Sequence, residues 1–349
     1  MELKQEQLLE LYLGELIGLK KIGKRVHKDP RTLKKEIEAI GITVPYPGST
    51  WTKVKRHVEG KFFRPIPREL KEMITGSLLG DAQLRVQTKQ KITEDPLKLE
   101  KYCKIVNQMQ DIQKRIKKRE KITIDDIKLW NNGVKSLAKV NTASLRFHKS
   151  ILELEWLKAL IAEFNSFIKV KVFVKPNRTK SSKWSCGFET AASIQFFELW
   201  RDWYTIEKGK LRKKLFKFRA ITPNTLLHWY VGDGYLTKNE LALSTHSFTL
   251  NEQSYLVKLL NAIGVKAKTV KKLKHYYIRL STKQENINNF FSYMREAKLY
   301  KKAEKCFPYK FSNEITKAEW KKQLMKEHPE YFILDYKLRE KLLQSLLKN

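Results

Sequence analysis

The sequence has 349 residues, of which 71 are lysine or arginine and 37 are aspartate or glutamate, so its formal net charge is +34. Hydrophobic residues make up 42% of the chain, which excludes a disordered polymer and suffices for the cores of roughly two or three domains. Such a surplus of positive charge opposes compaction unless an anionic partner offsets it. We therefore expect the phosphate backbone of a nucleic acid as the partner.

The three cysteines, Cys103, Cys186 and Cys306, are far apart, follow no zinc-binding spacing and imply no disulfide framework. No apolar run is long enough to span a membrane, and the stretch after Met1 lacks the apolar core of a signal peptide. We expect an intracellular, reducing location without a membrane partner, in either a prokaryotic cytoplasm or an organelle with its own genome.

Residues 1–45 are predicted to form a small helical domain. Apolar residues between Leu8 and Leu16 recur at helical spacing, and a second short helix is expected over residues 19–27. Asp29 as N-cap and Pro30 at the first helical position then predict a third helix, to about residue 40. The last two helices form a helix-turn-helix pattern, with a plain helical hairpin as the alternative. In the helix-turn-helix interpretation the DNA-binding candidates are Arg31 and Lys34.

Residues 46–67 are predicted to be a basic linker, because prolines at both of its ends disfavour regular structure. The stretch from Trp51 to His57 is expected to be a strand or arm that contacts the DNA backbone. Its candidate contacts are Lys53 and Lys55.

Two units of the same order follow. Residues 68–203 predict a helix, two strands, a helix, two strands and a helix, with a helical insertion at about 89–141. Residues 204–312 repeat this order, and residues 313–349 predict a tail of two helices without an assigned function. The predicted fold class is therefore α+β, with two pseudo-symmetric αββαββα repeats, antiparallel sheets and an N-terminal helical domain.

Each unit opens with an apolar helix that ends in Gly-Asp, at Gly80-Asp81 and at Gly232-Asp233. An acidic side chain at a helix C-terminus is unfavourable, because the helix dipole is negative there, and a bound cation would offset this cost. Gly76 and Gly80 lie four residues apart and leave one face of the first helix bare. Close packing of the two helices would bring Asp81 and Asp233 together as a hard-oxygen site suited to Mg²⁺. A single Gly-Asp pair would be an ordinary turn, but two copies in register favour a shared metal site.

These residues resemble the LAGLIDADG homing endonucleases, in the form with two motifs in one chain. The resemblance covers about residues 68–312 and rests on Thr75–Ala82 and Leu227–Gly234. It also rests on four landmarks, namely Trp203-Tyr204, Gly209-Lys210, Ile221-Thr222-Pro223 and Pro308-Tyr309-Lys310. The chain departs from the family pattern at Ala82, at the bulky His228 and Trp229, in the insertion and in the N-terminal domain.

The resemblance implies a monomeric, site-specific endonuclease that cuts both strands of a long double-stranded DNA target with two or three Mg²⁺ ions shared between the motifs. One alternative is an intron-encoded maturase that binds structured intron RNA to assist splicing, and another is a non-enzymatic DNA-binding regulator. In the nuclease, the resemblance implies metal binding by Asp81 and Asp233 with the carbonyl groups of Gly80 and Gly232, and catalytic assistance from Lys210, with Lys213 as the alternative, and from Lys310.

Outward side chains of the predicted strands would lie in the major groove, where they contact phosphates and base edges. In the first repeat the candidates are Arg85, Gln87, Arg146, His148, Lys171 and Lys175. In the second repeat they are Tyr235, Ser244, His246, Lys268, Lys271, Tyr277 and Arg279.

Overall fold

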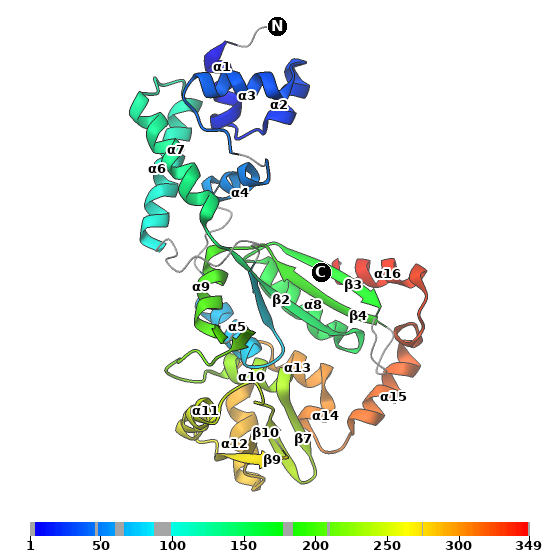
Figure 1. Cartoon of the computed structure of the whole chain (residues 1–349). Helices are drawn as coiled ribbons and strands as arrows, with labels where there is room; N and C mark the ends of the chain where they lie inside the picture. The colour runs from blue at the N-terminus through cyan, green and yellow to red at the C-terminus, as the bar shows by residue number, and fades with distance from the viewer. Residues whose placement is uncertain are drawn as a thin grey trace. The chain divides into compact units, whose positions relative to one another are not determined.

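The computed structural model of the chain describes residues 4–45, 48–59, 66–86, 99–176, 184–207, 210–273 and 275–347 (Figure 1). It divides into two compact units. Unit 1 joins Met1–Arg64 to Gln87–Thr142, and unit 2 joins Pro65–Val86 to Ala143–Asn349. The insertion in the first repeat thus folds with the N-terminal residues instead of standing alone. Among the described residues, no helix has the length and apolar character to cross a lipid bilayer.

Unit 1 is built of helices. They are α1 (Gln5–Leu9), the π-helix η1 (Glu10–Gly14), α2 (Leu19–Val26), α3 (Pro30–Ala39), α4 (Gly48–Val58), α6 (Leu99–Lys117) and α7 (Ile124–Lys139). The predicted N-cap of α3 is confirmed, since the Asp29 side chain accepts a hydrogen bond from the backbone of Arg31 at 2.7 Å. The α2–turn–α3 pattern is therefore present. The single helix predicted around Leu8–Leu16 is wrong, because the chain changes to a π-helix and then turns at Leu16, where φ is +53°.

The prediction of an irregular linker at residues 46–67 is also wrong where the structure describes it. Residues 48–58 form α4, and Trp51, Val54 and Val58 share one buried face of this helix. Trp51 stacks on Tyr12 with ring centroids 4.3 Å apart, and α4 packs against both helices of the insertion. Burial of this apolar face outweighs the local effect of the flanking prolines.

Unit 2 holds the two repeats, and the predicted order is confirmed in each. The first repeat consists of α5 (Arg68–Leu79), β1 (Gln83–Val86), β2 (Ala143–Ser150), α8 (Leu154–Asn165), β3 (Val170–Pro176), β4 (Trp184–Thr190) and α9 (Ile194–Trp203), with a short 3₁₀ turn η2 (Ile151–Glu153) before α8. The second consists of α10 (Pro223–Asp233), β7 (Gly234–Thr237), β8 (Glu240–Leu243), α11 (Leu250–Ala262), β9 (Ala267–Lys272), β10 (His275–Leu280) and α12 (Gln284–Arg295). Between the repeats lies a hairpin that was not predicted, β5 (Tyr204–Glu207) and β6 (Lys210–Lys213).

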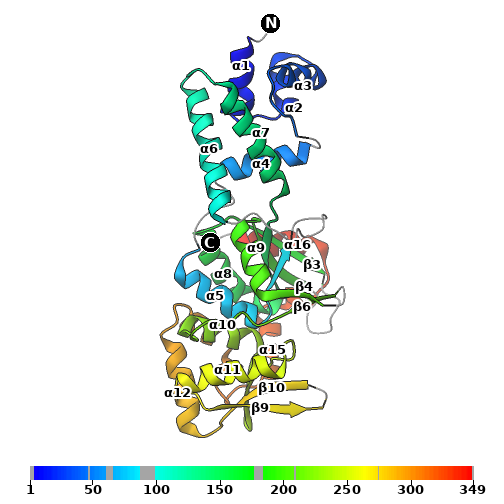
Figure 2. The same ribbon diagram turned by 60° about the vertical axis from the view of Figure 1, so that its left-hand side comes forward.

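The two sheets have the same topology. The strand orders are β1-β2-β4-β3 and β7-β8-β10-β9, and all neighbours are antiparallel. In the second repeat α11 packs against β9 and β10 (Figure 2). The fold is therefore α+β with two αββαββα repeats, and β1 and β7, which follow the two motif helices, are edge strands of their sheets.

The C-terminal segment contacts both repeats. It consists of α13 (Tyr300–Cys306), α14 (Pro308–Phe311), α15 (Lys317–Glu327), the 3₁₀ turn η3 (Pro329–Phe332) and α16 (Tyr336–Leu347). Helix α16 contacts β3 and α8, and it buries Leu342 and Leu346. The indole N–H of Trp184 donates to the carbonyl of Ile333 at 2.7 Å, and Arg339 donates to the carbonyl of Val174 at 3.0 Å. The tail thus covers part of the first repeat.

Candidate active site

Helices α5 and α10 pack against each other, and glycines permit their close approach. A Cβ atom on Gly80 would lie 3.2 Å from the Cα of Gly232, so the two backbones touch at this point. A Cβ on Gly76 would clash with the carbonyl oxygen of Thr225 and lie 2.9 Å from the Cβ of His228. Contact at Gly80 and Gly232 brings the aspartates that follow them to the same end of the helix pair.

The two helix ends differ in detail. Helix α10 continues through Asp233, as predicted, whereas α5 ends at Leu79 and has Gly80 as its C-cap. The packing of the two helices is asymmetric, because the buried His228 fills the space that Gly76 leaves. Its ring lies 5.3 Å from that of Trp156. Burial, followed by the positive charge of a nearby lysine, lowers the pKa of His228 to about 3, so this imidazole is a neutral packing group.

The carboxyl groups of Asp81 and Asp233 lie within hydrogen-bonding reach of each other and perturb each other's ionisation. Burial, the negative charge of Asp81 and the hydrogen bond between the two groups raise the pKa of Asp233 to about 7. Burial also disfavours ionisation of Asp81, but Lys149 more than offsets this effect, and the pKa of Asp81 falls below its usual value. Two crowded carboxylates that repel each other are the donor set that a divalent cation would relieve, so these residues fit such an ion.

Two lysines bind the backbone at the ends of the motif helices. The ammonium group of Lys213 donates to the carbonyl of Gly80 at 3.0 Å. That of Lys310 donates to the carbonyls of Val231 and Gly234 at 2.7 and 2.8 Å. Burial is the largest cause that lowers the pKa of each lysine, to about 8 in both cases. Lys310 therefore lies where the sequence landmark predicted, beside the second motif.

The position of Lys213 shows that the prediction of Lys210 for the first repeat is wrong. Lys210 was the expected residue for the first repeat, with Lys213 as the alternative, and the structure brings Lys213 to the motif. The two residues lie at opposite ends of β6, where Lys210 pairs with Glu207 and is exposed. The carbonyl of Gly80, predicted as a metal ligand, accepts the hydrogen bond from Lys213. Lys213 also faces both carboxylates, which raise its pKa against the effect of burial.

Sequence reasoning missed Lys149. Its ammonium group lies 2.7 Å from Asp81 and 3.2 Å from Glu153, and its side chain is only 7% exposed. Burial opposes its charge, but the two carboxylates raise the pKa of Lys149 above its usual value. The signal was present in the alternation of β2, because Lys149 occupies the same apolar face as Leu145 and Phe147. A lysine on the inward face of a strand requires buried acidic partners.

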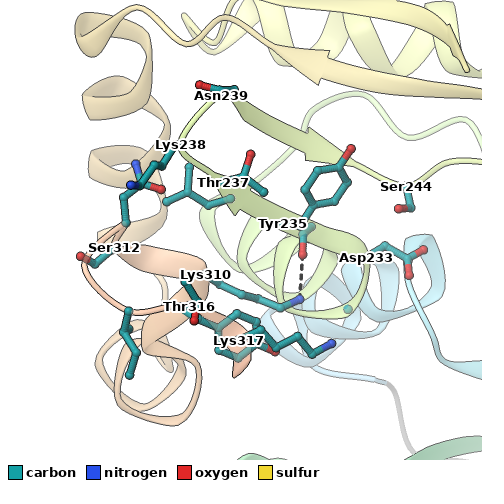
Figure 3. A pocket seen from close by; sticks show the side chains of 16 residues that line it. Asp233, Tyr235, Thr237, Lys238, Asn239, Ser244, Lys310, Ser312, Thr316 and Lys317 are labelled. Atoms are coloured by element: carbon teal, nitrogen blue, oxygen red, sulfur yellow. Dashed lines mark hydrogen bonds between the residues drawn. The ribbon is translucent and has the colours of Figure 1, made fainter. Parts of the chain in front are cut away.

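An open cleft of about 650 Å³ runs along the edge of β7 from the motif (Figure 3). Asp233 and Lys310 line its inner end, and Lys238 and Asn239 line it at the β7–β8 turn. The start of α15, at Lys317, contributes to the opposite wall. The dashed line in Figure 3 marks the hydrogen bond of Lys310 to the β7 backbone. Asp233 is therefore reachable from solvent through a cleft that carries basic and amide side chains.

The DNA-binding candidates of the first repeat that the structure describes share one sheet face. Strand register places Arg85, Arg146 and Lys171 on the face opposite the buried Leu145 and Phe147. His148 and Lys175 lie on this outward face as well. The guanidinium group of Arg146 lies over the ring of Phe173, 4.7 Å from its centroid. Gln87 falls outside the described residues. This basic face is suited to phosphate and base contacts, although the guanidinium group of Arg146 is already stacked on Phe173.

The candidates of the second repeat divide into two groups. Tyr235, Ser244, Lys268, Tyr277 and Arg279 share the outward face of their sheet, whereas Lys271 alternates to the other face and His246 lies in the turn after β8. Although Tyr277 has this register, its side chain is buried and donates to Glu240 at 2.6 Å, so the prediction that Tyr277 contacts DNA bases is wrong. Tyr235 donates to the same carboxylate at 2.9 Å.

The four candidates in unit 1 have different surroundings. Arg31 is exposed on α3, and Lys34 lies on the same helix near Glu38, with a 3.6 Å ion pair. Lys53 donates to the carbonyl of Ala138 at 2.9 Å and Lys55 to that of Leu16 at 2.8 Å. The last two lysines therefore bind unit 1 internally, which corrects their assignment to a DNA-binding arm.

A comparison with known protein families adds to this geometry of two repeats with adjoining acidic helix ends. Residues 129–290 match the model of the LAGLIDADG DNA endonuclease family. Over 78 residues, or 21% of the chain, it is 38% identical to an uncharacterised protein of Methanocaldococcus jannaschii, and the match spans 30% of that protein's length. The solved structure of the homing endonuclease I-WcaI bound to its DNA recognition sequence is similar with a TM-score of 0.48 and 14% identity, over 78% of this chain and 96% of that one.

Proposed function

We propose that the chain is a metal-dependent, site-specific endonuclease that cuts both strands of a long double-stranded DNA target. One observation carries this proposal. The two motif aspartates, Asp81 and Asp233, come from separate repeats and meet where α5 and α10 touch. A pair of carboxylates at the pseudo-symmetry axis is suited to serve both strands of a duplex.

Asp81 and Asp233 would hold the divalent ions, and Mg²⁺ is the ion that their oxygen donors suit. When bound, such ions supply charge stabilisation and a water molecule of lowered pKa for phosphodiester hydrolysis. The cost of crowding two carboxylates, visible in the raised pKa of Asp233, makes this site favourable for cations and unfavourable for anions until a cation is present.

Lys213 and Lys310 would act on opposite sides of this site. Each ammonium group is held by backbone carbonyls at the end of a motif helix, so its position is set before DNA binds. With pKa values of about 8, both lysines are mainly charged at neutral pH and are suited to stabilise negative charge on a phosphate. The outward faces of the two sheets would bind the duplex on either side of the cut.

The experiment is Mg²⁺-dependent cleavage of DNA that spans the insertion site of the gene. It compares the wild type with Asp81→Asn and Asp233→Asn, and we expect both variants to lose double-strand cleavage. Equal cleavage by all three proteins would contradict the proposal. Binding of a structured intron RNA without cleavage of the adjacent DNA would support the maturase alternative instead.

A further inference from the structure

The two motif aspartates have unequal surroundings, although the repeats that supply them have the same topology. Strand register shows which residues of the two repeats are equivalent. Leu84 and Leu236 each lie three residues after their motif aspartate, and they pair with Leu145 and Leu241, so these last two residues are equivalent. Lys149 lies four residues after Leu145, and Thr245 lies four residues after Leu241, so Thr245 is the equivalent of Lys149. The two positions therefore differ by one full positive charge.

The difference extends to a second position. Glu153 is the N-cap residue of α8, and Thr249 is the N-cap residue of α11. Thr249 caps its helix in the usual way, accepting from the backbone of Glu252. The Glu153 side chain makes no cap bond and instead lies 3.2 Å from the Lys149 ammonium group. The first repeat thus carries a charged pair where the second carries two threonines.

The charged pair is directed at one of the two motif acids. Lys149 donates to Oδ2 of Asp81 at 2.7 Å, whereas Thr245 is fully buried and its hydroxyl has no hydrogen-bond partner among the described residues. A cation that binds Asp81 through its other oxygen would lie within a few Å of a fixed ammonium group. Charges that close repel strongly, because the surrounding protein screens them less than water does.

We propose that Lys149 is a positioning residue that makes the two halves of the metal site unequal, so that one ion binds more weakly and one DNA strand is cut after the other. The order of strand cleavage in this inference rests on the proposed nuclease function, whereas the unequal metal binding does not. Lys149 holds the Asp81 carboxylate in place in the metal-free protein and raises the metal concentration needed to fill the position beside it. The enzyme then passes through a nicked intermediate in which the same strand is always cut first.

The test transfers the second repeat's residues to the first, as Lys149→Thr with Glu153→Thr. The double variant removes both members of the pair, so no unpaired charge is left buried between them. Lys298→Met is the matched control, because it removes a lysine–glutamate pair of 2.7 Å, with Glu163, away from the site. Mn²⁺ binding to the free protein is followed by electron paramagnetic resonance. In parallel, cleavage of a duplex labelled on either strand gives the rates of the two cuts.

For the wild type and the control we expect two Mn²⁺ affinities that differ by about tenfold or more, and one strand that is cut first. In the double variant the two affinities should converge and the ratio of the two cutting rates should fall toward one. The inference is overturned if the wild type binds its ions with equal affinity or binds none, or if the double variant keeps both the gap and the strand order. If no protein cleaves DNA, but the two Mn²⁺ affinities still differ in the wild type and converge in the double variant, only the nuclease function is overturned.

Discussion

Replacing Asp233 with asparagine should stabilise the metal-free protein, and the gain should grow as the pH rises. Asp233 is ionised in the unfolded chain above its ordinary pKa of 3.8, but in the folded protein it stays protonated up to about pH 7. A carboxyl group whose folded pKa is raised costs stability above its unfolded pKa, and the cost reaches its full value above the folded pKa. Asparagine has the shape of the protonated acid and no charge to lose.

The size of the effect follows from the pKa of Asp233, which rises from 3.8 to about 7. A tenfold change in an ionisation constant corresponds to about 1.4 kcal/mol, so the ionised group costs about 4 kcal/mol at pH 8 and about 2 kcal/mol at pH 5. The variant should therefore gain about 2 kcal/mol more at the higher pH. Divalent metal ions should stabilise the wild type by relieving the same repulsion, and they should stabilise the variant less.

The assay is urea unfolding in EDTA at about pH 5 and pH 8, read as the free energy of unfolding of unit 2. Asp81→Asn is the informative control. It also removes one of the two charges but takes away a partner of Lys149, so its gain should be smaller than that of Asp233→Asn. Equal stability of wild type and Asp233→Asn at pH 8, or an equal gain at both pH values, would refute the reasoning about the crowded carboxylates.

Three further changes test other parts of the structure. Gly76→Ala should destabilise unit 2 by about 2 kcal/mol or more, since the added methyl group would clash with backbone of α10; an unchanged unfolding midpoint would show that the helices are not in close contact. Lys213→Met should slow DNA cleavage at least about tenfold while Lys210→Met leaves it near the wild-type rate, and the reverse order in single-turnover assays would restore Lys210 to the site. Trp51→Ala should destabilise unit 1 by about 3 kcal/mol or more, with faster hydrogen exchange in α6 and α7; exchange that stays as slow as in the wild type would mean that α4 is not part of this core.

Local signals in the sequence were sufficient for most elements. Asp29 followed by Pro30 marks a helix start, because an N-cap oxygen and a fixed φ each act within a few residues. Strand β4, at Trp184–Thr190, takes the place in the first repeat that the predicted order of elements gives it. Helix α4 was missed although Trp51, Val54 and Val58 have helical spacing, since prolines near its ends suggested an irregular segment.

Assignment of single side chains depended on contacts between residues that are distant in sequence. The backbone of Thr43 donates to the Asn131 side chain, 88 positions away, and contacts of this kind join the insertion to the N-terminal residues. Likewise, the hairpin that contains β6 decides that Lys213 and not Lys210 reaches Gly80. A spacing argument gives neither result, because both depend on how the chain is folded back on itself.

The sequence by itself determined that two Gly-Asp helix ends open two repeats of the same order, since apolar periodicity and motif spacing are local properties of the chain. The tertiary structure decided that Asp81 and Asp233 meet, and that the buried Lys149 pairs with Asp81. The alternation of β2 marks Lys149 as an inward-facing lysine, but only the fold, which brings β2 to the end of α5, shows that its acidic partner is Asp81. The physical reason is that a carboxylate's ionisation and its affinity for a cation depend on the charges within a few Å, and folding alone determines which charges those are.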